Sequence, residues 1–211
     1  MIPKNIIQTS RKDEPNYMAV HMINSRSRGW RYKHYSDKEV IKFFMDNPLP
    51  EFPNIIEKFY SFSYGEHRAD LFRYYYLYLK GGVYFDTDLM IEVNIDEIIK
   101  DYKFVSVNST YFPKSIFQGF IACVPNHPIL YDALKNMYQT PNHHLIQNSS
   151  NFHDICRNFY NIVSNYHDKE TVYLYEEVFG DKYTANIIDK KTKNIMMKHY
   201  HIKKIIPGCE L

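Results

Sequence analysis

The chain has 211 residues, of which 45% are hydrophobic, so it can bury one sizeable core and is not expected to be disordered as a whole. Lys and Arg number 26 against 24 Asp and Glu, which gives a formal net charge of +2. A dedicated nucleic-acid-binding protein normally carries a marked basic excess, so this balance argues against nucleic acid as a partner.

The cysteines and the hydropathy pattern bear on the compartment. Cys123, Cys156 and Cys209 are widely spaced and form neither a zinc-binding pattern nor a disulfide framework, so reduced thiols are expected. The first residues enter the fold without the apolar segment of a secretory signal peptide. No run of about 18 apolar residues predicts a membrane span. These features predict a cytoplasmic protein, and they leave its oligomeric state open.

The predicted elements alternate between strand and helix from the start of the chain. The first four are a strand at 6–9, a helix at 16–26 that ends near Gly29, a strand at 30–35, and a helix that stops before Asn47-Pro48. Ser36-Asp-Lys-Glu39 opens this second helix as a capping box, because the Ser36 hydroxyl can accept from the Glu39 N–H while the Glu39 carboxylate reaches back. No repeat or linker divides the chain, so we expect one domain over residues 1–211.

Residues 66–88 are the most informative stretch. Apolar residues recur there at three- and four-residue spacing, which predicts a helix with one buried stripe made of Ala69, Phe72, Tyr76 and Leu79. Gly81-Gly82 supplies a flexible C-terminal cap, and a short strand at 83–85 follows it. Asp86-Thr87-Asp88 comes where this strand ends.

The remaining predicted elements continue the alternation. Residues 104–108 and 120–124 predict strands, and His127-Pro128 opens a helix, with proline in the tolerated first turn. Alternating helices and strands are typical of a mostly parallel, Rossmann-type sheet with helices on both faces. We therefore expect an α/β fold of this kind.

Asp86 and Asp88 are candidate ligands of a divalent metal ion. Two neighbouring carboxylates repel each other unless a cation or hydrogen-bond donors compensate their charge. Mn²⁺ or Mg²⁺ accepts such oxygen ligands and can also bridge a diphosphate. The end of a strand is also where open α/β sheets bind their ligands. Taken alone, an Asp-x-Asp sequence fits an ordinary surface turn as well.

Asp70 and Arg73 lie one helical turn apart on the helix that precedes the aspartate pair. They can point from the same face, away from the apolar stripe. One interpretation is a surface ion pair, which would be worth only a few tenths of a kcal/mol. The other is a polar helix face that lines the same cleft as Asp86 and Asp88.

The segment from Arg68 to Asp88, RADLFRYYYLYLKGGVYFDTD, resembles the signature of the glycosyltransferases with a DXD sugar-binding motif. This is the retaining family of the yeast initiating mannosyltransferase type, related to the catalytic domains of large clostridial glucosylating toxins. Residues 2–9 are similar to that family's first strand, and residues 117–121 with 125–128 resemble its next block. The resemblance runs from residue 2 to about residue 130, and it implies a GT-A-like fold.

The resemblance implies roles at the donor for five residues of this segment. It places Asp70 and Arg73 on the donor sugar and near its phosphate. It places Asp86 beside the ribose and the metal, and Asp88 directly on the metal, with Thr87 between them at the donor.

The resemblance also implies a nucleobase site and a second donor contact. The first-strand backbone at Ile7, Gln8 and Thr9 would cradle the base. Tyr84 would lie beneath the donor, although a core tyrosine before a sheet end accounts for it equally well. Gln118 stands where the family often has Asn, so its amide either holds the donor sugar at its reacting face or is a satisfied loop amide.

A metal held by two carboxylates and a diphosphate usually takes a further protein ligand. His199 and His201 follow a strand-like stretch at 195–197, and we expect them on a short tail that can fold over the donor. They stand where the family carries a His-containing closing motif ahead of a Trp, whose place Ile205 or Ile206 takes here. Both histidines are candidate metal ligands, and a purely structural role is the alternative for each.

Together these features predict a retaining glycosyltransferase that depends on Mn²⁺ or Mg²⁺. It would move a sugar from a nucleoside-diphosphate-sugar donor, with UDP-sugars favoured, to a hydroxyl of a glycan, protein or small-molecule acceptor. A metal-dependent phosphohydrolase with an Asp-x-Asp nucleophile and acid is a second class, although it needs a further acidic pair and no paired Asp cluster follows residue 88. A non-catalytic nucleotide-sugar binder is the third.

Overall fold

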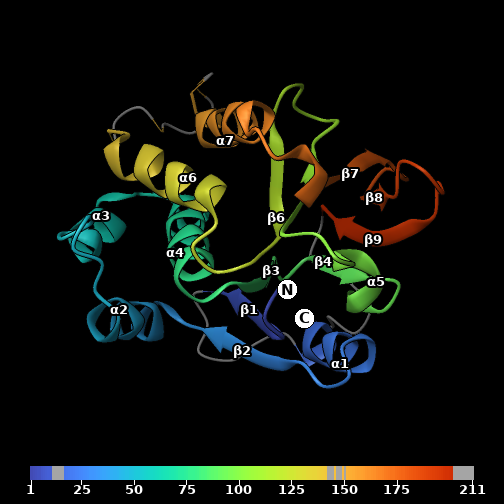
Figure 1. The fold of residues 1–211 in the computed structure, drawn as a ribbon, viewed down its shortest axis with the longest axis horizontal. Coiled ribbons are helices and arrows are strands. Elements are labelled where there is room, and N and C mark those ends of the chain that lie inside the picture. Colours follow the sequence, from blue (N-terminus) through green and yellow to red (C-terminus); the bar gives the residue numbers. More distant parts are fainter. Residues whose placement is uncertain (11–16, 142–144, 146–148, 150, 202–211) are drawn as a thin grey trace.

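Nine strands form a single sheet in the order β2-β1-β3-β6-β5-β7-β8-β9-β4 in the computed structural model, which describes residues 1–10, 17–141, 145, 149 and 151–201 (Figure 1). The strands are β1 (Asn5–Thr9), β2 (Arg31–Tyr35), β3 (Gly82–Phe85), β4 (Leu89–Ile91), β5 (Phe104–Asn108), β6 (Ile116–Cys123), β7 (Val172–Phe179), β8 (Thr184–Ile188) and β9 (Ile195–Tyr200). The α-helices are α1 (Tyr17–Arg26), α2 (Asp37–Asp46), α3 (Ile55–Ser61), α4 (Gly65–Lys80), α5 (Ile95–Ile99), α6 (Pro128–Gln139) and α7 (Asp154–Asn165).

The sheet is mixed, whereas the alternation of elements predicted a mostly parallel one. β1 runs parallel to both β2 and β3, and β5 runs parallel to β7, but the other five pairings are antiparallel. Residues 180–183 and 189–194 link β7, β8 and β9, and connections this short can join only antiparallel strands. The α/β architecture is confirmed. The strand directions differ because β7, β8 and β9 form consecutive hairpins, and because β6 and β9 also pair in antiparallel fashion with β3 and β4 from earlier in the chain.

Apolar side chains on the two faces of the sheet form two separate cores. On β3, Tyr84 belongs to one core while Val83 and Phe85 belong to the other, as the two-residue period of a strand requires. Helices α2, α3, α4, α6 and α7 contribute to the first core, and α1 and α5 contribute to the second. Helices therefore pack on both faces, as the sequence predicted.

Helix α4 is buried on nearly all sides rather than along one stripe. Phe72 and Tyr76 lie in the core as predicted, but Ala69 and Leu79 are only partly buried. Residues 70–77 are all buried, because α4 packs against α3, α6, β3 and β6. A helix enclosed in this way loses the one-sided pattern of a surface helix, and its charged residues lie inside the protein.

Gly81 and Gly82 join α4 to β3 at a point where a side chain would not fit. Both have positive φ, 62° and 105°, which glycine adopts at little cost. A Cβ on Gly81 would lie 2.7 Å from the ring of Pro125, and a Cβ on Gly82 would lie 2.5 Å from the carbonyl oxygen of Asn5. This close approach lets β3 pair with β1. Asp86, the residue after the end of β3, therefore follows directly on a strand in the interior of the sheet.

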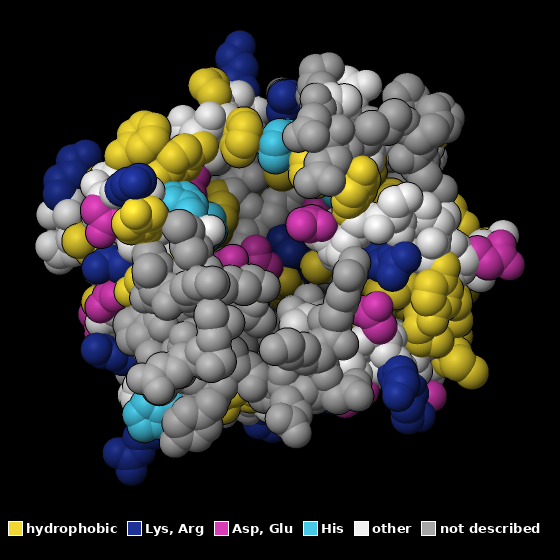
Figure 2. Space-filling view, turned by 180° about the vertical axis from the view of Figure 1, so that it is seen from behind, with side chains coloured by type: hydrophobic (Ala, Val, Ile, Leu, Met, Phe, Trp, Pro, Cys, Tyr) yellow, Lys and Arg dark blue, Asp and Glu magenta, His cyan; other side chains and the backbone are white. Residues whose placement is uncertain are grey.

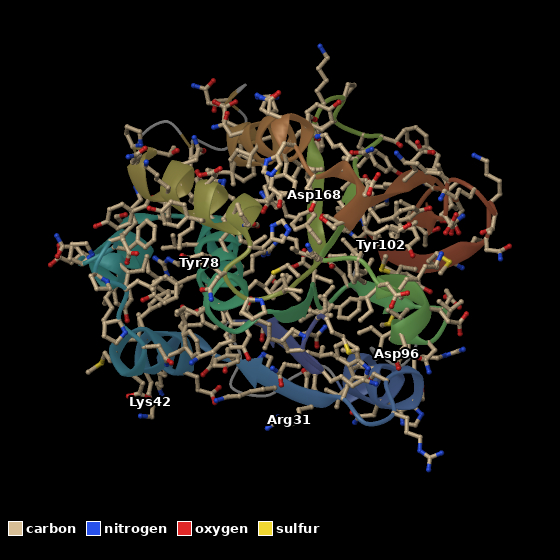
Figure 3. The ribbon with its side chains drawn as sticks, viewed as in Figure 1. Arg31, Lys42, Tyr78, Asp96, Tyr102 and Asp168 are labelled. Atoms are coloured by element: carbon tan, nitrogen blue, oxygen red, sulfur yellow. The ribbon has the colours of Figure 1, made fainter. Side chains whose placement is uncertain are left out.

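Charged side chains line the outer edge of the sheet at β2. Arg31 and Lys33 are exposed on this strand. Figure 3 shows Arg31, and Lys42 on the neighbouring α2, extending away from the molecule. Charges on an edge strand discourage pairing with a strand of another molecule, so this edge is protected.

Two expectations about the compartment can be compared with the structure. Among the described residues, no helix combines the length and the apolar composition that crossing a bilayer requires. Cys123 and Cys156 are free thiols, as predicted, and Cys209 lies outside the described residues.

Candidate active site

The backbone of Asp86 is fixed from both neighbouring strands. β1 and β3 are parallel, with Ile7 opposite Tyr84, so their carboxyl ends lie side by side. Gln8 Nε2 donates to the Asp86 carbonyl oxygen at 3.2 Å, and the Asp86 N–H donates to the carbonyl oxygen of Gly119 on β6 at 2.8 Å. The first residue of the Asp-x-Asp pair thus lies at the carboxyl end of two parallel strands, where ligands of α/β sheets bind.

Arg73 joins the predicted helix residue to the predicted strand-end residue. Its Nη1 lies 3.1 Å from Asp70 Oδ1 and donates to the carbonyl oxygen of Gln118 at 2.6 Å. Its Nη2 donates to Asp86 Oδ1 at 3.1 Å and to the Tyr84 hydroxyl at 3.0 Å, while the guanidinium carbon lies 4.1 Å from the centre of the Tyr84 ring. Four Nη contacts therefore hold Asp70, Asp86 and β6 around one cation.

The Asp70–Arg73 pair is buried, so the surface ion pair considered from the sequence is not what the fold contains. The Arg73 side chain is 4% exposed and the Asp70 side chain 10% exposed. Removing charges from water costs free energy that only close pairing returns. Arg73 stands between two carboxylates, and its hydrogen bonds point to them rather than to solvent.

The charge balance of this group acts on Asp70. Burial raises the pKa of Asp70 to about 7; Arg73 opposes this shift, whereas the charge of Asp86 adds to it. Burial by itself would lower the pKa of Arg73. Tyr84, Asp86 and Asp70 together raise this pKa by more than burial lowers it, so the guanidinium stays charged. Burial therefore accounts for most of the raised pKa of Asp70, and the single cation that Asp70 shares with Asp86 offsets it only in part.

Tyr84 is both a core residue and part of the site. Its ring is buried, and its hydroxyl donates to Asp86 Oδ1 at 2.6 Å and lies 3.3 Å from Thr9 Oγ1. Burial, with the charge of Asp86, raises the pKa of Tyr84 well above its usual value against the opposing effect of Arg73. The phenol therefore stays protonated and can keep donating to Asp86.

Gln118 turns its side chain into the protein. Its Oε1 accepts from the Tyr74 hydroxyl, and its Nε2 donates to Cys156 Sγ at 3.4 Å. Burial raises the pKa of Cys156 to about 12, so the thiol is neutral. The side chain of Gln118 is therefore an amide with its hydrogen bonds satisfied, which was one of the two alternatives from the sequence. Its backbone carbonyl oxygen accepts from Arg73. A contact of Gln118 with the donor stays a prediction.

Gly119 leaves room for the Asp86 carboxylate. A Cβ at this position would lie 3.1 Å from Asp86 Oδ2 and 2.3 Å from the ring of Phe117. Phe117 in turn packs on His199, with ring centres 4.6 Å apart. The absence of a side chain at residue 119 thus lets Asp86, Phe117 and His199 approach one another.

His199 lies within β9 and not on a tail, which corrects the expectation from the sequence. β9 pairs with β8 on one side and with β4 on the other, and His199 is opposite Leu89, the residue after Asp88. The strand continues to Tyr200, whose N–H donates to the Asp88 carbonyl oxygen at 3.0 Å. Three more strands after residue 124 bring His199 beside the aspartate pair, so its position depends on the whole sheet.

The charges of both Asp86 and Asp88 act on the imidazole of His199. Burial favours the neutral ring, but a contact of Nδ1 with Glu177 Oε1 at 3.3 Å and the charges of Asp88 and Asp86 together raise the pKa of His199. His201 lies one ring further out, with its ring centre 4.8 Å from that of His199 and its Nε2 3.1 Å from the Tyr111 hydroxyl. The structure thus brings His199 to the site and leaves His201 beside it.

No three His, Cys, Asp or Glu side chains within the described ranges come close enough to hold a metal ion by themselves. Carboxylate and imidazole are nevertheless the donors that Mn²⁺ takes in proteins, and Asp86, Asp88 and His199 supply both kinds. A metal bound here would need oxygens from a ligand as well. Ile205 and Ile206, at the position of the family's Trp, lie outside the described residues.

The residues expected at the nucleobase are placed by β1. Ile7 and Gln8 are buried and Thr9 is half-buried. The Gln8 amide is held in place because the Tyr32 hydroxyl donates to its Oε1 at 2.9 Å. These residues lie beside Asp86, and their contact with a base stays a prediction.

Part of the aspartate pair reaches the surface. Asp86, Thr87 and Asp88 are half-buried, in contrast to Asp70 and Arg73. The face opposite to that of Figure 1 has a central hollow in which acidic and basic side chains lie close together (Figure 2). The half-buried Asp-x-Asp residues are therefore partly open to solvent, while the Asp70–Arg73 pair lies inside the protein.

Glu177 is the residue of this site that the sequence did not suggest. It is buried on β7 and accepts from the Ser109 hydroxyl at 2.7 Å as well as contacting His199. The two-residue period of β7 buries Tyr173, Tyr175 and Glu177 on one face. A carboxylate on an otherwise apolar strand face is the signal that would have found it.

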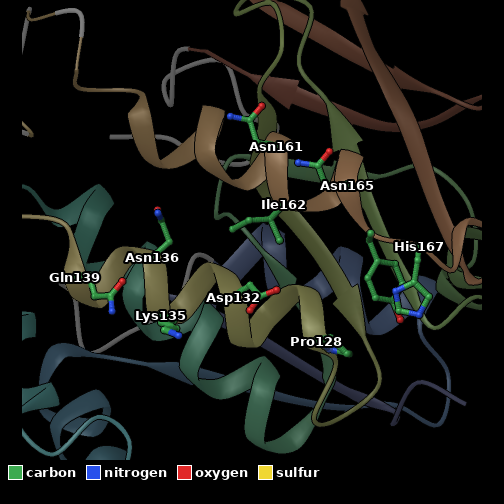
Figure 4. A pocket seen from close by; sticks show the side chains of 10 residues that line it. Pro128, Asp132, Lys135, Asn136, Gln139, Asn161, Ile162, Asn165 and His167 are labelled. Carbon is green, nitrogen blue, oxygen red and sulfur yellow. The ribbon is translucent and has the colours of Figure 1, made fainter.

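A second hollow lies away from these residues. An open groove of about 590 Å³ runs between α6 and α7 (Figure 4). Asp132, Lys135 and Asn136 line it from α6, and Asn161 and Asn165 line it from α7. None of its lining residues belongs to the Arg73 group, so its size gives no reason to move the site there.

Comparison with known proteins agrees with this geometry. Residues 3–105 match the family model described as "Glycosyltransferase sugar-binding region containing DXD motif". Inositol phosphoceramide mannosyltransferase 1 of Schizosaccharomyces pombe is 25% identical over 133 residues, which are 63% of this chain and 37% of the relative. A mannosyl phosphorylinositol ceramide synthase of Saccharomyces cerevisiae, SUR1, is 27% identical over 143 residues, which are 65% of this chain and 35% of the relative. The chain thus spans little more than a third of the length of these curated relatives.

A solved structure supports the fold. The PaToxG glycosyltransferase superposes with a TM-score of 0.50 at 14% sequence identity, covering 77% of this chain and 68% of that one. At this identity the likeness concerns the fold alone. The family match includes the segment that carries Asp70, Arg73, Asp86 and Asp88, so over this part the chain is similar to glycosyltransferases whose sugar-binding region contains a DXD motif.

Proposed function

We propose that this chain, acting as one GT-A-like domain over residues 1–211, transfers a sugar from a nucleoside-diphosphate-sugar donor to a hydroxyl acceptor with retention of configuration. The observation that carries the proposal is the bridge from Asp70 through Arg73 to Asp86 beneath the half-buried Asp-x-Asp pair. Such a buried, charged group is costly to the fold, and perturbed charged groups of this kind cluster at functional sites.

The chain's own residues divide the work at the donor. Asp70 offers a carboxylate to the hydroxyls of the donor sugar. Arg73 keeps Asp70 and Asp86 in fixed positions and carries one further N–H, at the buried Nε, that has no partner among the described residues. Gln8 and Thr9 present the end of β1 to the nucleobase.

Asp86, Asp88 and His199 would hold Mn²⁺ or Mg²⁺ together with the donor diphosphate. A bound divalent ion neutralises the charge that grows on the departing nucleoside diphosphate. Glu177 fixes the orientation of His199 from behind, as ligating histidines commonly require.

Retention is proposed to occur on one face of the sugar. The acceptor hydroxyl oxygen forms a bond to the anomeric carbon as that carbon's bond to the diphosphate oxygen breaks, and the hydroxyl proton passes to the departing oxygen. Gln118, the polar residue expected near the reacting face, is an amide and a poor nucleophile. A covalent sugar–enzyme intermediate is therefore not part of the proposal.

The contacts of Asp86 argue against the phosphohydrolase alternative. That reaction needs the first aspartate of the pair as a free nucleophile. Here Asp86 Oδ1 accepts from both Arg73 and Tyr84, and such donors reduce the nucleophilicity of a carboxylate. The position suits a residue that binds and orients better than one that attacks.

Calorimetry tests the metal and donor sites together. Mn²⁺ should bind weakly to the protein alone and more tightly with UDP or GDP present, because two carboxylates leave most of the metal's coordination shell to water and a diphosphate replaces some of it. Asp88→Asn keeps the side-chain shape and should abolish this mutual assistance, whereas Asp46→Asn, on the exposed end of α2, should not. If the wild type binds Mn²⁺ with the same affinity in the absence of nucleotide, in the presence of UDP and in the presence of GDP, the proposed site is ruled out.

Slow donor hydrolysis in the absence of acceptor separates a transferase from a non-catalytic binder. UDP-glucose, UDP-galactose, UDP-N-acetylglucosamine and GDP-mannose form the first panel, because UDP-sugars are expected from the sequence and the two yeast relatives are named for mannosyl transfer. If the protein binds a donor in the presence of Mn²⁺ but never hydrolyses or transfers it, the transferase is excluded and the chain is a non-catalytic nucleotide-sugar binder.

A further inference from the structure

Three aromatic rings from separate parts of the chain meet on the surface beside the site. Tyr111 lies in the loop between β5 and β6, Phe179 ends β7, and His201 follows β9. The Tyr111 ring centre lies 4.5 Å from that of Phe179 and 5.1 Å from that of His201. We call these three residues the outer aromatic cluster. Phe179 is 67% exposed, so a large apolar ring is held at the surface.

The outer aromatic cluster is built on a fixed base. Glu177 accepts from the Ser109 hydroxyl at 2.7 Å with its carboxylate, and from the Thr110 hydroxyl with its backbone oxygen. These bonds tie the loop that carries Tyr111 to β7. The N–H of His201 donates to the carbonyl oxygen of Tyr183 at 2.8 Å, which holds the third ring against the turn between β7 and β8.

The outer aromatic cluster adjoins the donor site without being part of it. His201 packs on His199, with ring centres 4.8 Å apart, and His199 lies within electrostatic reach of Asp88. Glu177 contacts His199 on one side and anchors the Tyr111 loop on the other. A ligand on the exposed rings would therefore stand next to a donor held at Asp86 and Asp88.

We propose that the outer aromatic cluster is an acceptor subsite that binds a pyranose ring of a glycan or glycoside. This inference rests on the proposed transferase function. A pyranose presents C–H groups on its faces and hydroxyls around its edge, so it fits an aromatic face bordered by polar groups. The Tyr111 hydroxyl, the His201 ring nitrogens and the exposed carboxylate of Asp181, which acts electrostatically on both rings, supply that border.

Saturation-transfer NMR tests the subsite without turnover. The probes are methyl α-mannoside, methyl α-glucoside and methyl β-galactoside, each with the wild type, Phe179→Ala and Tyr60→Ala. Tyr60 is a matched control because it is 57% exposed on α3, at the opposite end of the molecule from β7 (Figure 1). At least one glycoside should give a signal with the wild type and Tyr60→Ala, and Phe179→Ala should weaken it about tenfold through loss of the ring contact.

A kinetic measurement then separates this inference from the function on which it rests. With a glycoside acceptor present, the ratio of sugar transfer to donor hydrolysis should fall about tenfold in Phe179→Ala and stay at the wild-type value in Tyr60→Ala. A wild type that neither transfers nor hydrolyses any donor would refute the proposed function, and the NMR comparison would still decide the subsite.

Two results would overturn the subsite. One is the absence of a signal from all three glycosides with the wild type. The other is an equal signal with the wild type and Phe179→Ala; if Phe179→Ala then also loses binding to phosphatidylcholine vesicles, the exposed rings serve a lipid surface instead.

Discussion

The guanidinium of Arg73 donates to the Asp86 carboxylate over 3.1 Å and joins helix α4 to the residue that follows β3. Arg73→Ala removes the cation between Asp70 and Asp86. The buried Asp70 carboxylate and the half-buried Asp86 carboxylate then have no positive charge between them. We expect the free energy of unfolding to fall by about 3 kcal/mol, since an uncompensated buried charge is costly. This reverses the outcome implied by a surface ion pair, for which stability would hardly change. Urea unfolding followed by circular dichroism measures the difference.

Arg157→Ala is the matched control. Arg157 and Asp154 also form an i,i+3 pair on a helix, at 2.6 Å, but their side chains are 41% and 38% exposed. Its removal should cost less than about 1 kcal/mol. Equal losses in the two variants would show that the burial of the Arg73 group has no energetic consequence.

Gly119→Ala is expected to disturb Asp86 and His199 at once. The new Cβ would lie 2.3 Å from the Phe117 ring, which packs on His199, and 3.1 Å from Asp86 Oδ2. The ring must move, so we expect a loss of about 1–3 kcal/mol in the free energy of unfolding and a larger proportional loss of donor turnover. Thermal unfolding and donor hydrolysis measure the two effects.

The double variant Gly119→Ala with Phe117→Ala identifies the cause. Phe117→Ala removes the ring that the new Cβ meets, so adding Gly119→Ala to it should cost much less stability than in the wild type. Additive losses would show that the clash with Phe117 is not the reason.

The local part of the site could be predicted because its residues are close in sequence. Asp70, Arg73 and Asp86 belong to one helix-turn-strand segment, and the glycines between helix and strand fix their relation. Residues 104–108 were predicted as a strand with the bounds that β5 has. Such elements have strong local signals, and their positions follow from the chain over short distances.

The rest of the site depends on which strands become neighbours. Glu177 lies about ninety residues after Asp86, and it reaches His199 only because β8 returns the chain and β9 follows it. The apolar pattern of a strand does not show whether the strand runs parallel or antiparallel to its neighbour. The alternation of helices and strands favoured a mostly parallel sheet, whereas the sheet is mixed. The enclosure of α4 was missed for the same reason, since α6 and β6 cover it from later in the chain.

Glu177→Gln tests the base that supports both His199 and the Tyr111 loop. Glutamine can still accept from Ser109 and contact His199, but it lacks the charge that strengthens those bonds. We expect the free energy of unfolding to fall by about 1–2 kcal/mol, as for the loss of charge-assisted bonds in a buried place. Chemical unfolding at pH 7, in the presence of a metal chelator, provides the measurement.

Glu176→Gln is the control on the same strand. Glu176 points to the other face of β7, and its pairing with Lys190 at 3.6 Å is exposed. Its replacement should change stability by less than about 0.5 kcal/mol. If both variants behave alike, the contacts of Glu177 do not stabilise this part of the sheet.

His127 gives the protein a pH dependence that can be measured apart from the site. It caps α6, with Nδ1 accepting from the Ile129 N–H at 3.3 Å, and it is buried against Phe104 and Tyr166. Burial, helped by the charge of Lys103, lowers the pKa of His127 to about 4 from an ordinary value of 6.5. The folded state therefore binds this proton less readily than the unfolded chain does.

A histidine with a lowered pKa stabilises the fold above its unfolded pKa, and this contribution is lost as the pH falls. Between pH 6.5 and pH 4, we expect His127 to account for a fall of about 2 kcal/mol in the free energy of unfolding. His127→Asn keeps a good helix N-cap but does not titrate, so its unfolding free energy should decline less over this range. Urea unfolding at half-unit steps of pH gives both curves, and the other histidines cancel in their difference. Parallel curves for wild type and His127→Asn would mean that the buried ring takes up its proton as easily in the folded protein as in the unfolded chain.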